Sequence, residues 1–204
     1  METKLKSASL TLPVSALRDL LSGAVIFTGS AKDNLPALNS VMLKSEGGLL
    51  NAAATDRYRL INGWTPAYKA REGESHEFTP VLISEASVKA ILNTLKPIKS
   101  GNATLELGES ALIVLTEAGT NTAPLVEATF PPYDHLFNAG EGEPVQEIAF
   151  NPNYFADFGK ISGKSGGVMV RFNGNKAISI DFNGEVALSG ATWRGLLMPQ
   201  RKAN

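Results

Sequence analysis

The chain has 204 residues, of which 43% are hydrophobic and 19% are charged, and its formal net charge is −1. This composition is typical of a globular protein long enough for one large or two small packed domains. The absence of cysteine excludes a disulfide framework and a thiolate metal site. With so little net charge, nucleic-acid binding would have to come from local segregation of charge.

The sequence offers no signal for secretion or membrane insertion. Its first residues, METKLKSASLTLP, lack the apolar core of a secretory signal, and no apolar run is long enough to cross a membrane. We therefore expect a cytoplasmic protein without membrane contact.

One structural plan occurs three times along the chain. Each copy consists of a short alternating strand, a helix-start signal and an amphipathic helix, and several hairpin-like strands follow it. The copies are SLTLPVSALRDLLSGAVIF, PVLISEASVKAILNTLKPI and EIAFNPNYFADFGKIS. This repeat predicts three strand–helix–sheet units.

Helices are expected at 13–27, 84–99 and 151–164. Pro13 and Pro152 suit a first helical turn, Ser84 and Asn151 are natural N-caps, and Pro97 ends the second helix. The spacing of apolar residues predicts three buried stripes: Val14, Leu17, Leu21 and Val25; Val88, Ile91, Leu92 and Leu95; Tyr154, Phe155, Phe158 and Ile161.

Between the helices, short apolar or alternating runs predict antiparallel hairpins with turns at Glu46-Gly47-Gly48, Gly108-Glu109, Asn173-Gly174 and Asn183-Gly184. The fold class is therefore α+β, with the helices gathered on one face of the sheets. The expected strands are 41–45, 49–54, 59–67, 103–107, 111–116, 122–127, 168–172, 177–182, 186–189 and 192–198.

A polar, glycine-rich stretch at 138–144 has the character of a linker. It divides a domain of two units, residues 1–137, from a single unit, residues 145–204. A charged loop near 69–77 separates the two units of the first domain.

The expected helices carry more cations than carboxylates. Their net charge is +3 in a chain of −1, because only Asp19, Glu85 and Asp157 oppose six cations. Such residues serve either as a solvated helix face or as weak, sequence-independent contacts with DNA phosphates. The candidate DNA-binding residues are Arg18, Lys89, Lys96, Lys99, Lys160 and Lys164.

No catalytic constellation is present in the sequence. Gly163-Lys164-Ser165 resembles the end of a phosphate-binding loop, but Phe158 stands where the first glycine is required. His76 and His135 are the only histidines and have neither metal-ligand nor triad spacing. We expect no catalytic residue, metal or cofactor, and no enzymatic activity.

The stretch 51–64, NAAATDRYRLINGW, predicts two strands joined by a polar turn. The turn presents Tyr58, Arg59 and Leu60 together. An aromatic ring, a guanidinium and a leucine on one rigid corner are common in protein-binding spots, although an ordinary hairpin corner has the same make-up.

This stretch also carries a resemblance to a known family. ATD-x-Y-RL, followed some seventy residues later by FPPYDHLF and near the C-terminus by LLMP-x-R, resembles the bacterial β sliding clamp. Residues 7–137 look like the clamp's middle domain, and residues 145–204 look like the second half of its last domain. The resemblance implies the DNA-clamp fold, with helices lining a ring that encircles double-stranded DNA.

The resemblance further implies a cleft that receives peptides of DNA polymerase or the clamp loader. Taken singly, Leu38, Leu196 and Met198 also suit an ordinary core. By motif position, the cleft residues are Leu38, Thr55, Tyr58, Arg59, Leu60, Pro131, His135, Leu136, Leu196 and Met198.

Two features depart from the family pattern. His135 stands where the family usually has a basic residue. The chain also has three units where the family's clamp has six and its ring twelve, so four copies would be needed to close a ring. We expect self-association, as a tetramer first and a dimer second.

The sequence leaves two functional interpretations. One is a compact, phage-encoded sliding clamp. The other is a clamp-fold binding module, such as a decoy for clamp-binding peptides, that does not encircle DNA.

Overall fold

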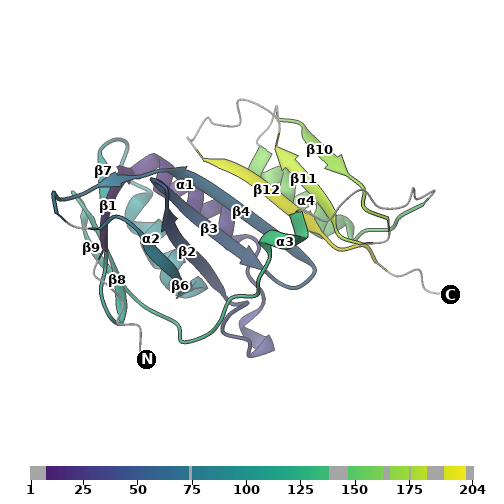
Figure 1. The fold of residues 1–204 in the computed structure, drawn as a ribbon, viewed down its shortest axis with the longest axis horizontal. Coiled ribbons are helices and arrows are strands. Elements are labelled where there is room, and N and C mark those ends of the chain that lie inside the picture. Colours follow the sequence, from purple (N-terminus) through teal and green to yellow (C-terminus); the bar gives the residue numbers. More distant parts are fainter. Residues whose placement is uncertain are drawn as a thin grey trace.

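The computed structural model describes residues 8–73, 75–137, 147–162, 166–174, 176–182 and 191–200. Within them the chain forms two antiparallel sheets and the helices α1 (Val14–Val25), α2 (Glu85–Leu95), α3 (Asp134–Phe137) and α4 (Pro152–Ser162), with a 3-10 turn at Ala31–Asp33 (Figure 1). The strands are β1 (Ala8–Pro13), β2 (Ser40–Glu46), β3 (Leu49–Thr55), β4 (Arg59–Pro66), β5 (Tyr68–Lys69), β6 (Phe78–Ser84), β7 (Asn102–Leu107), β8 (Ala111–Thr116), β9 (Gly119–Pro124), β10 (Val168–Arg171), β11 (Ile178–Phe182) and β12 (Thr192–Leu197).

The two sheets mix strands of different repeats. One sheet has the strand order β5-β1-β7-β8-β9, and the other has the order β10-β11-β12-β4-β3-β2-β6. In the second sheet β12 pairs antiparallel with β4, from Thr192 opposite Trp64 to Leu197 opposite Arg59. The first and third units therefore share one continuous sheet.

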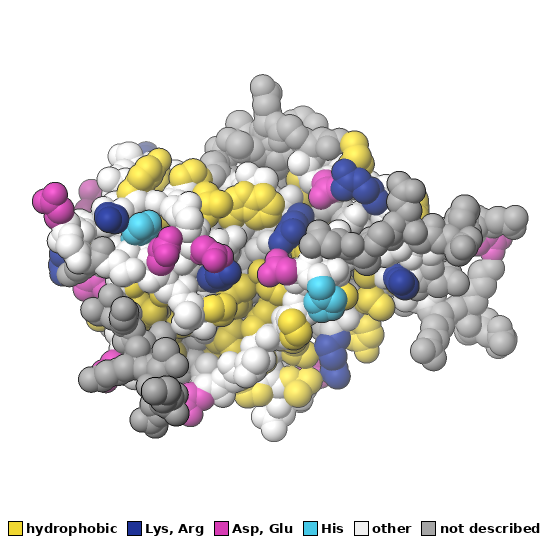
Figure 2. Space-filling view, in the orientation of Figure 1, with side chains coloured by type: hydrophobic (Ala, Val, Ile, Leu, Met, Phe, Trp, Pro, Cys, Tyr) yellow, Lys and Arg dark blue, Asp and Glu magenta, His cyan; other side chains and the backbone are white. Residues whose placement is uncertain are grey.

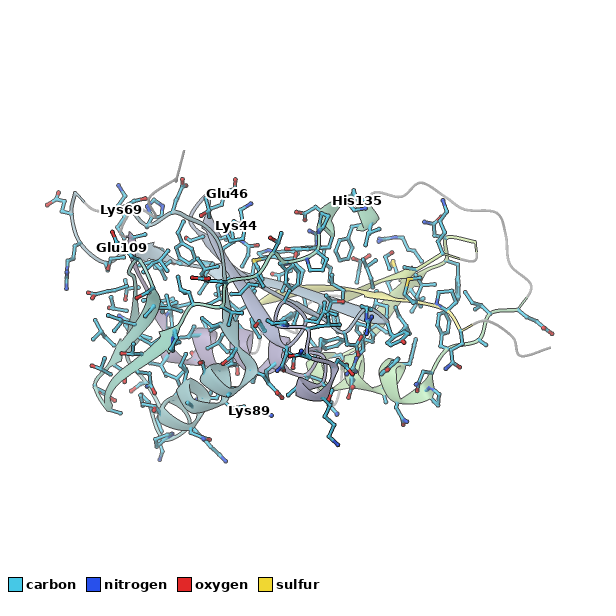
Figure 3. All side chains as sticks on the ribbon, turned by 90° about the horizontal axis from the view of Figure 1, so that it is seen from below. Lys44, Glu46, Lys69, Lys89, Glu109 and His135 are labelled. Carbon is cyan, nitrogen blue, oxygen red and sulfur yellow. The ribbon has the colours of Figure 1, made fainter. Side chains whose placement is uncertain are left out.

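The helices α1, α2 and α4 lie on one side of the sheets, and the short α3 lies on the opposite side (Figure 3). This arrangement confirms the α+β class and the predicted common helix face. In the part of the chain that the structure describes, no helix has the length and apolarity needed to span a bilayer.

Helix starts follow the predicted capping chemistry. The Ser84 Oγ accepts a hydrogen bond from the Ser87 N–H at 3.1 Å, and the Asn151 Oδ1 accepts one from the Asn153 N–H at 3.0 Å. Pro13 occupies the N-cap position of α1 instead of its first turn. The helices are shorter than the predicted windows and end at Val25, Leu95 and Ser162.

Most predicted stripe residues are buried, but Phe155 is 38% exposed, so its assignment to the core was wrong. The helix α4 packs on the sheet through Phe158 and Ser162, and Phe155 lies at the edge of that stripe, 6.3 Å from the ring of Phe150. Val25 and Leu92 are only half-buried, at the margins of their stripes.

Other boundaries differ from the predictions. The strand expected before α4 is reduced to an isolated bridge between Ala149 and Gln200, and the strand expected at 122–127 is Gly119–Pro124. The short elements α3 and β5 were not predicted. The expected strand at 186–189, the turn at 183–184 and the linker at 138–144 lie outside the described residues, and the domain division stays a prediction.

Three glycines allow the helices to approach the shared sheet. The ring of Trp193 in β12 lies directly over Gly63 of β4 and against Gly23 of α1, where a Cβ atom would overlap it. The ring of Phe158 in α4 lies in the same way on Gly195. The odd-numbered residues of β4 and β12 therefore face the helices, and the even-numbered ones face the opposite side of the sheet.

Candidate functional site

The turn between β3 and β4 is held by its own polar side chains. The Thr55 Oγ1 donates to the Arg59 carbonyl at 2.7 Å and accepts from the Arg57 N–H at 3.2 Å. The Asp56 carboxylate accepts from the N–H groups of Tyr58 and Arg59, each at 3.0 Å. The predicted polar turn is present, and its side-chain-to-backbone bonds make it rigid.

The Arg59 side chain is buried behind this turn. Its Nε donates to Asp56 at 3.1 Å, its Nη2 donates to the Ile26 carbonyl at 3.0 Å, and its Nη1 forms an ion pair with Asp157 of α4. The guanidinium also lies 4.9 Å from the Phe27 ring centre. Through these contacts Arg59 connects the first unit to α4 of the third unit. Little of its side-chain surface remains accessible to a bound peptide.

The face of the sheet opposite the helices carries an apolar pair across the junction of β4 and β12. Leu60 lies opposite Leu196, and one step further the Met198 N–H donates to the Tyr58 carbonyl at 2.8 Å. Leu60 and Leu196 are buried, whereas Tyr58 is 54% exposed and Met198 is 45% exposed. These four predicted residues thus meet at one junction from distant parts of the sequence, and the Tyr58 ring itself stacks on Tyr154 of α4, with 5.7 Å between the ring centres.

Helix α3 is held over the same face by Arg194, a residue that belongs to none of the sequence motifs above. Its Nη2 donates to Asp134 at 2.8 Å and its Nε donates to the Asn62 Oδ1 at 3.0 Å. The guanidinium also lies 4.0 Å from the Phe137 ring centre. The one available signal was a cation inside the otherwise apolar strand ATWRGLLMP.

A groove of about 740 Å³ lies between residues 128–135 and the same sheet face. On this face hydrophobic side chains run through the middle, and charges of both signs are interspersed around them (Figure 2). Burial, and after it the charge of Asp134, raise the pKa of Tyr133 to about 12. The groove is lined by Met42, Lys44, Glu46, Asn51, Asn62, Pro80, Leu82, Ala128, Thr129, Phe130, Pro131, Pro132, Tyr133, Asp134, His135 and Arg194.

The remaining predicted cleft residues fall in three places. Pro131 and His135 are exposed and line this groove, and Leu136 on α3 is 43% exposed. Thr55 is buried within the turn. Leu38 is buried in the loop between α1 and β2, where its carbonyl accepts from the Gly29 N–H at 2.7 Å.

Most of the predicted DNA-contacting cations lie on the helix side. Lys96 and Lys99 are exposed at and beyond the end of α2. Lys89 pairs with Glu85 and Lys160 pairs with Asp157, each at 2.5 Å. Arg18 is half-buried and donates to the Ile98 carbonyl at 3.2 Å, so it is partly engaged within the protein. Lys164 lies outside the described residues.

Within the described ranges no three His, Cys, Asp or Glu side chains are grouped as metal ligands. The arrangement is one of apolar contacts, hydrogen-bonded turns and surface cations, which suits binding of macromolecules.

No protein-family model matches the chain. A "Beta sliding clamp" from Micrococcus luteus is 30% identical over 129 residues, which cover 61% of this chain and 38% of that protein. The β subunit of DNA polymerase III from Thermotoga maritima matches the structure with a TM-score of 0.75 at 16% identity, over 97% of this chain and 66% of its own.

The same subunit from Pseudomonas aeruginosa matches with a TM-score of 0.76 at 19% identity, over 99% of this chain and 69% of its own. The chain has the sliding-clamp fold, and over part of its length it is similar in sequence to a bacterial β sliding clamp. It spans only about two fifths of the Micrococcus luteus protein and about two thirds of the Thermotoga maritima subunit.

Proposed function

We propose that this protein acts as a sliding-clamp-like replication accessory protein. It binds double-stranded DNA without sequence preference and tethers partners of the polymerase type. The observation that carries this proposal is the seven-stranded sheet shared by the first and third units, with α1, α2 and α4 all on one side of the sheets.

The DNA contact is assigned to the helix side, where Lys89, Lys96, Lys99 and Lys160 are exposed. Lys89 and Lys160 each pair with a carboxylate of their own helix, Glu85 and Asp157. The lysine side chains are 61% and 62% exposed, and pairs made by such exposed lysines are weak enough to exchange a carboxylate for a phosphate. Because lysines on a helix surface contact phosphates and not base edges, the binding carries no sequence information. Arg18 and Lys164 complete the proposed set.

The peptide contact is assigned to the junction of β4 and β12. The buried pair Leu60 and Leu196 forms its floor, and Tyr58 and Met198 offer exposed apolar surface at one end. An apolar floor with an aromatic edge suits a short extended peptide, here a segment of a polymerase or a clamp loader. In this proposal the buried Arg59 shapes the cleft from behind and does not hold the peptide itself.

The proposal includes self-association, as a tetramer first and a dimer second. In the described residues β9 and β10 are terminal strands of the two sheets, and unpaired strand edges are surfaces that proteins usually cover. Three units in each chain would give twelve in a closed ring of four copies.

The test of the DNA face compares duplex-DNA affinity over a range of salt concentrations. The variant carries Lys89→Gln and Lys96→Gln together, and the matched control is Lys44→Gln, because Lys44 and Lys89 lie on opposite sides of the molecule (Figure 3). We expect the slope of log affinity against log salt to fall by about one for each lost contact, and the control to keep the full slope. An unchanged slope in the double variant would overturn the assignment.

A further inference from the structure

Arg57 has a backbone conformation that its side chain disfavours. Its φ is +80°, in the left-handed region, and the only other described residue of this kind besides glycine is Asn34, whose short polar side chain tolerates the conformation. An arginine has no such local compensation. Strained positions of this type concentrate at binding sites, where the surrounding structure imposes them.

The surrounding turn imposes this conformation on Arg57. The Arg57 N–H donates to the Thr55 Oγ1, and the next two N–H groups donate to the Asp56 carboxylate. The bond from the Thr55 Oγ1 to the Arg59 carbonyl closes the turn. With its backbone fixed on both sides, Arg57 has little freedom except in its own side-chain torsions.

The guanidinium of Arg57 is exposed, and within the described part of the chain it has no hydrogen-bond or ion-pair partner. Two nearby carboxylates are already engaged. Asp56 accepts from two N–H groups and from the Arg59 Nε, and Asp157 is shared between Arg59 and Lys160. Arg57 therefore carries an unneutralised positive charge next to Tyr58, at the exposed apolar end of the candidate cleft.

We propose that Arg57 determines the specificity of this cleft by pairing with a carboxylate of the bound peptide, adjacent to the apolar side chains that pack on Tyr58 and Met198. The inference rests on the peptide-binding function proposed above. A planar guanidinium pairs with a carboxylate through two parallel hydrogen bonds, which gives both strength and direction.

A peptide carboxylate fits this position better than a DNA phosphate does. Binding of a DNA backbone needs several cations in a row, whereas Arg57 is followed by the exposed Tyr58, whose carbonyl accepts from the N–H of the exposed Met198. The described cations of the proposed DNA face lie on or just beyond α1, α2 and α4, on the helix side of the sheets.

The test uses two fluorescently labelled peptides that differ in one residue. Each contains a glutamine followed by a pair of large apolar residues, and the residue beside that pair is Asp in one peptide and Asn in the other. Anisotropy titrations measure both affinities at low and at high salt. We expect the native chain to bind the Asp peptide about fivefold more tightly at low salt, with a smaller difference at high salt.

Three variants isolate the role of Arg57. In Arg57→Gln the charge is lost but the disfavoured backbone stays occupied by a large side chain, and we expect the affinity ratio to fall to about one. Arg57→Gly removes both the charge and the backbone strain. It should also give an affinity ratio of about one, even if the glutamine variant folds poorly. Lys69→Gln removes an exposed charge far from His135, toward the other end of the molecule (Figure 3), and should keep the native ratio.

The outcomes separate this inference from the proposed function. If neither peptide binds the native chain, the cleft itself is absent and both proposals fail. If both peptides bind and the ratio is the same in the native chain and in Arg57→Gln, only the role of Arg57 is overturned. The role is also overturned if Arg57→Gln lowers the salt slope of DNA binding while the peptide ratio stays unchanged.

Discussion

Arg59 of β4 and Asp157 of α4 form an ion pair across the junction of the first and third units, with side chains only 8% and 16% exposed. The same guanidinium lies 4.8 Å from the ring centre of Tyr154 and donates to the Ile26 carbonyl at the end of α1. One side chain thus ties α1, β4 and α4 together. Its position behind the peptide cleft follows from this packing.

We expect Asp157→Ala to lower the free energy of unfolding by about 3 kcal/mol, because it removes one partner of a largely buried charge pair. Lys160→Ala is the matched control, since Lys160 contacts the other oxygen of the same carboxylate from an exposed position. Its cost should stay below about 1 kcal/mol. Urea unfolding followed by circular dichroism measures both, and equal small losses would contradict a structural role for the buried pair.

A second prediction about stability rests on the contact between Gly195 and Phe158. A Cβ atom at residue 195 would overlap the Phe158 ring, so Gly195→Ala should cost about 1–3 kcal/mol by forcing α4 away from the sheet. Gly159 lies on α4 itself with open space where its Cβ would be, so Gly159→Ala should raise the free energy of unfolding by about 0.5–1 kcal/mol. If thermal unfolding shows the same sign for both substitutions, the proposed packing is wrong.

Tyr133 predicts a pH dependence at high pH. Burial raises its pKa from 10.0 to about 12 in the folded chain, so the unfolded chain loses this proton first. The stabilising effect is complete below pH 10 and is lost as the pH rises toward 12. We expect Tyr133→Phe to flatten the decline of unfolding free energy in this range, and to remove the corresponding step from the ultraviolet titration of tyrosinate. A native titration that equals that of the variant would refute the burial effect.

The cleft residues differ in their expected contributions to peptide affinity. A short peptide with apolar residues after a glutamine should bind with micromolar affinity, about −8 kcal/mol. Met198→Ala should cost on the order of 1–2 kcal/mol, because an exposed methionine beside an apolar floor is a typical interface anchor. His135→Ala should cost less, since His135 lines the neighbouring groove. Titration calorimetry checks both, and absence of binding by the well-folded native chain would remove the cleft assignment.

Self-association is measured most directly by light scattering. We expect a defined oligomer at micromolar concentration, most readily a tetramer and otherwise a dimer, because β9 and β10 are terminal strands of their sheets among the described residues. A chain that stays monomeric over the whole concentration range cannot close a ring of its own copies.

Local sequence chemistry predicted much of this fold. The repeat of strand, start signal and amphipathic helix located α1, α2 and α4, and Ser84 and Asn151 cap helices as expected. The polar turn at Thr55 and Asp56 was also predictable, because its hydrogen bonds join residues at most four positions apart. Such features are set by near neighbours in the chain, and the residues alone specify them.

Features that depend on distant residues were settled only by the tertiary structure. The expected strand before α4 is no more than a bridge at Ala149, since its surroundings offer Gln200 as its one partner among the described residues. The buried state of Arg59 depends on Asp157, which lies 98 positions away. Arg194 holds α3 through a contact with Asp134 over 60 positions. The sequence by itself determined the three units and the polar turn. Long-range pairing of β12 with β4 joined the first and third units into one sheet and so decided the shape of the cleft, and no local pattern encodes that pairing.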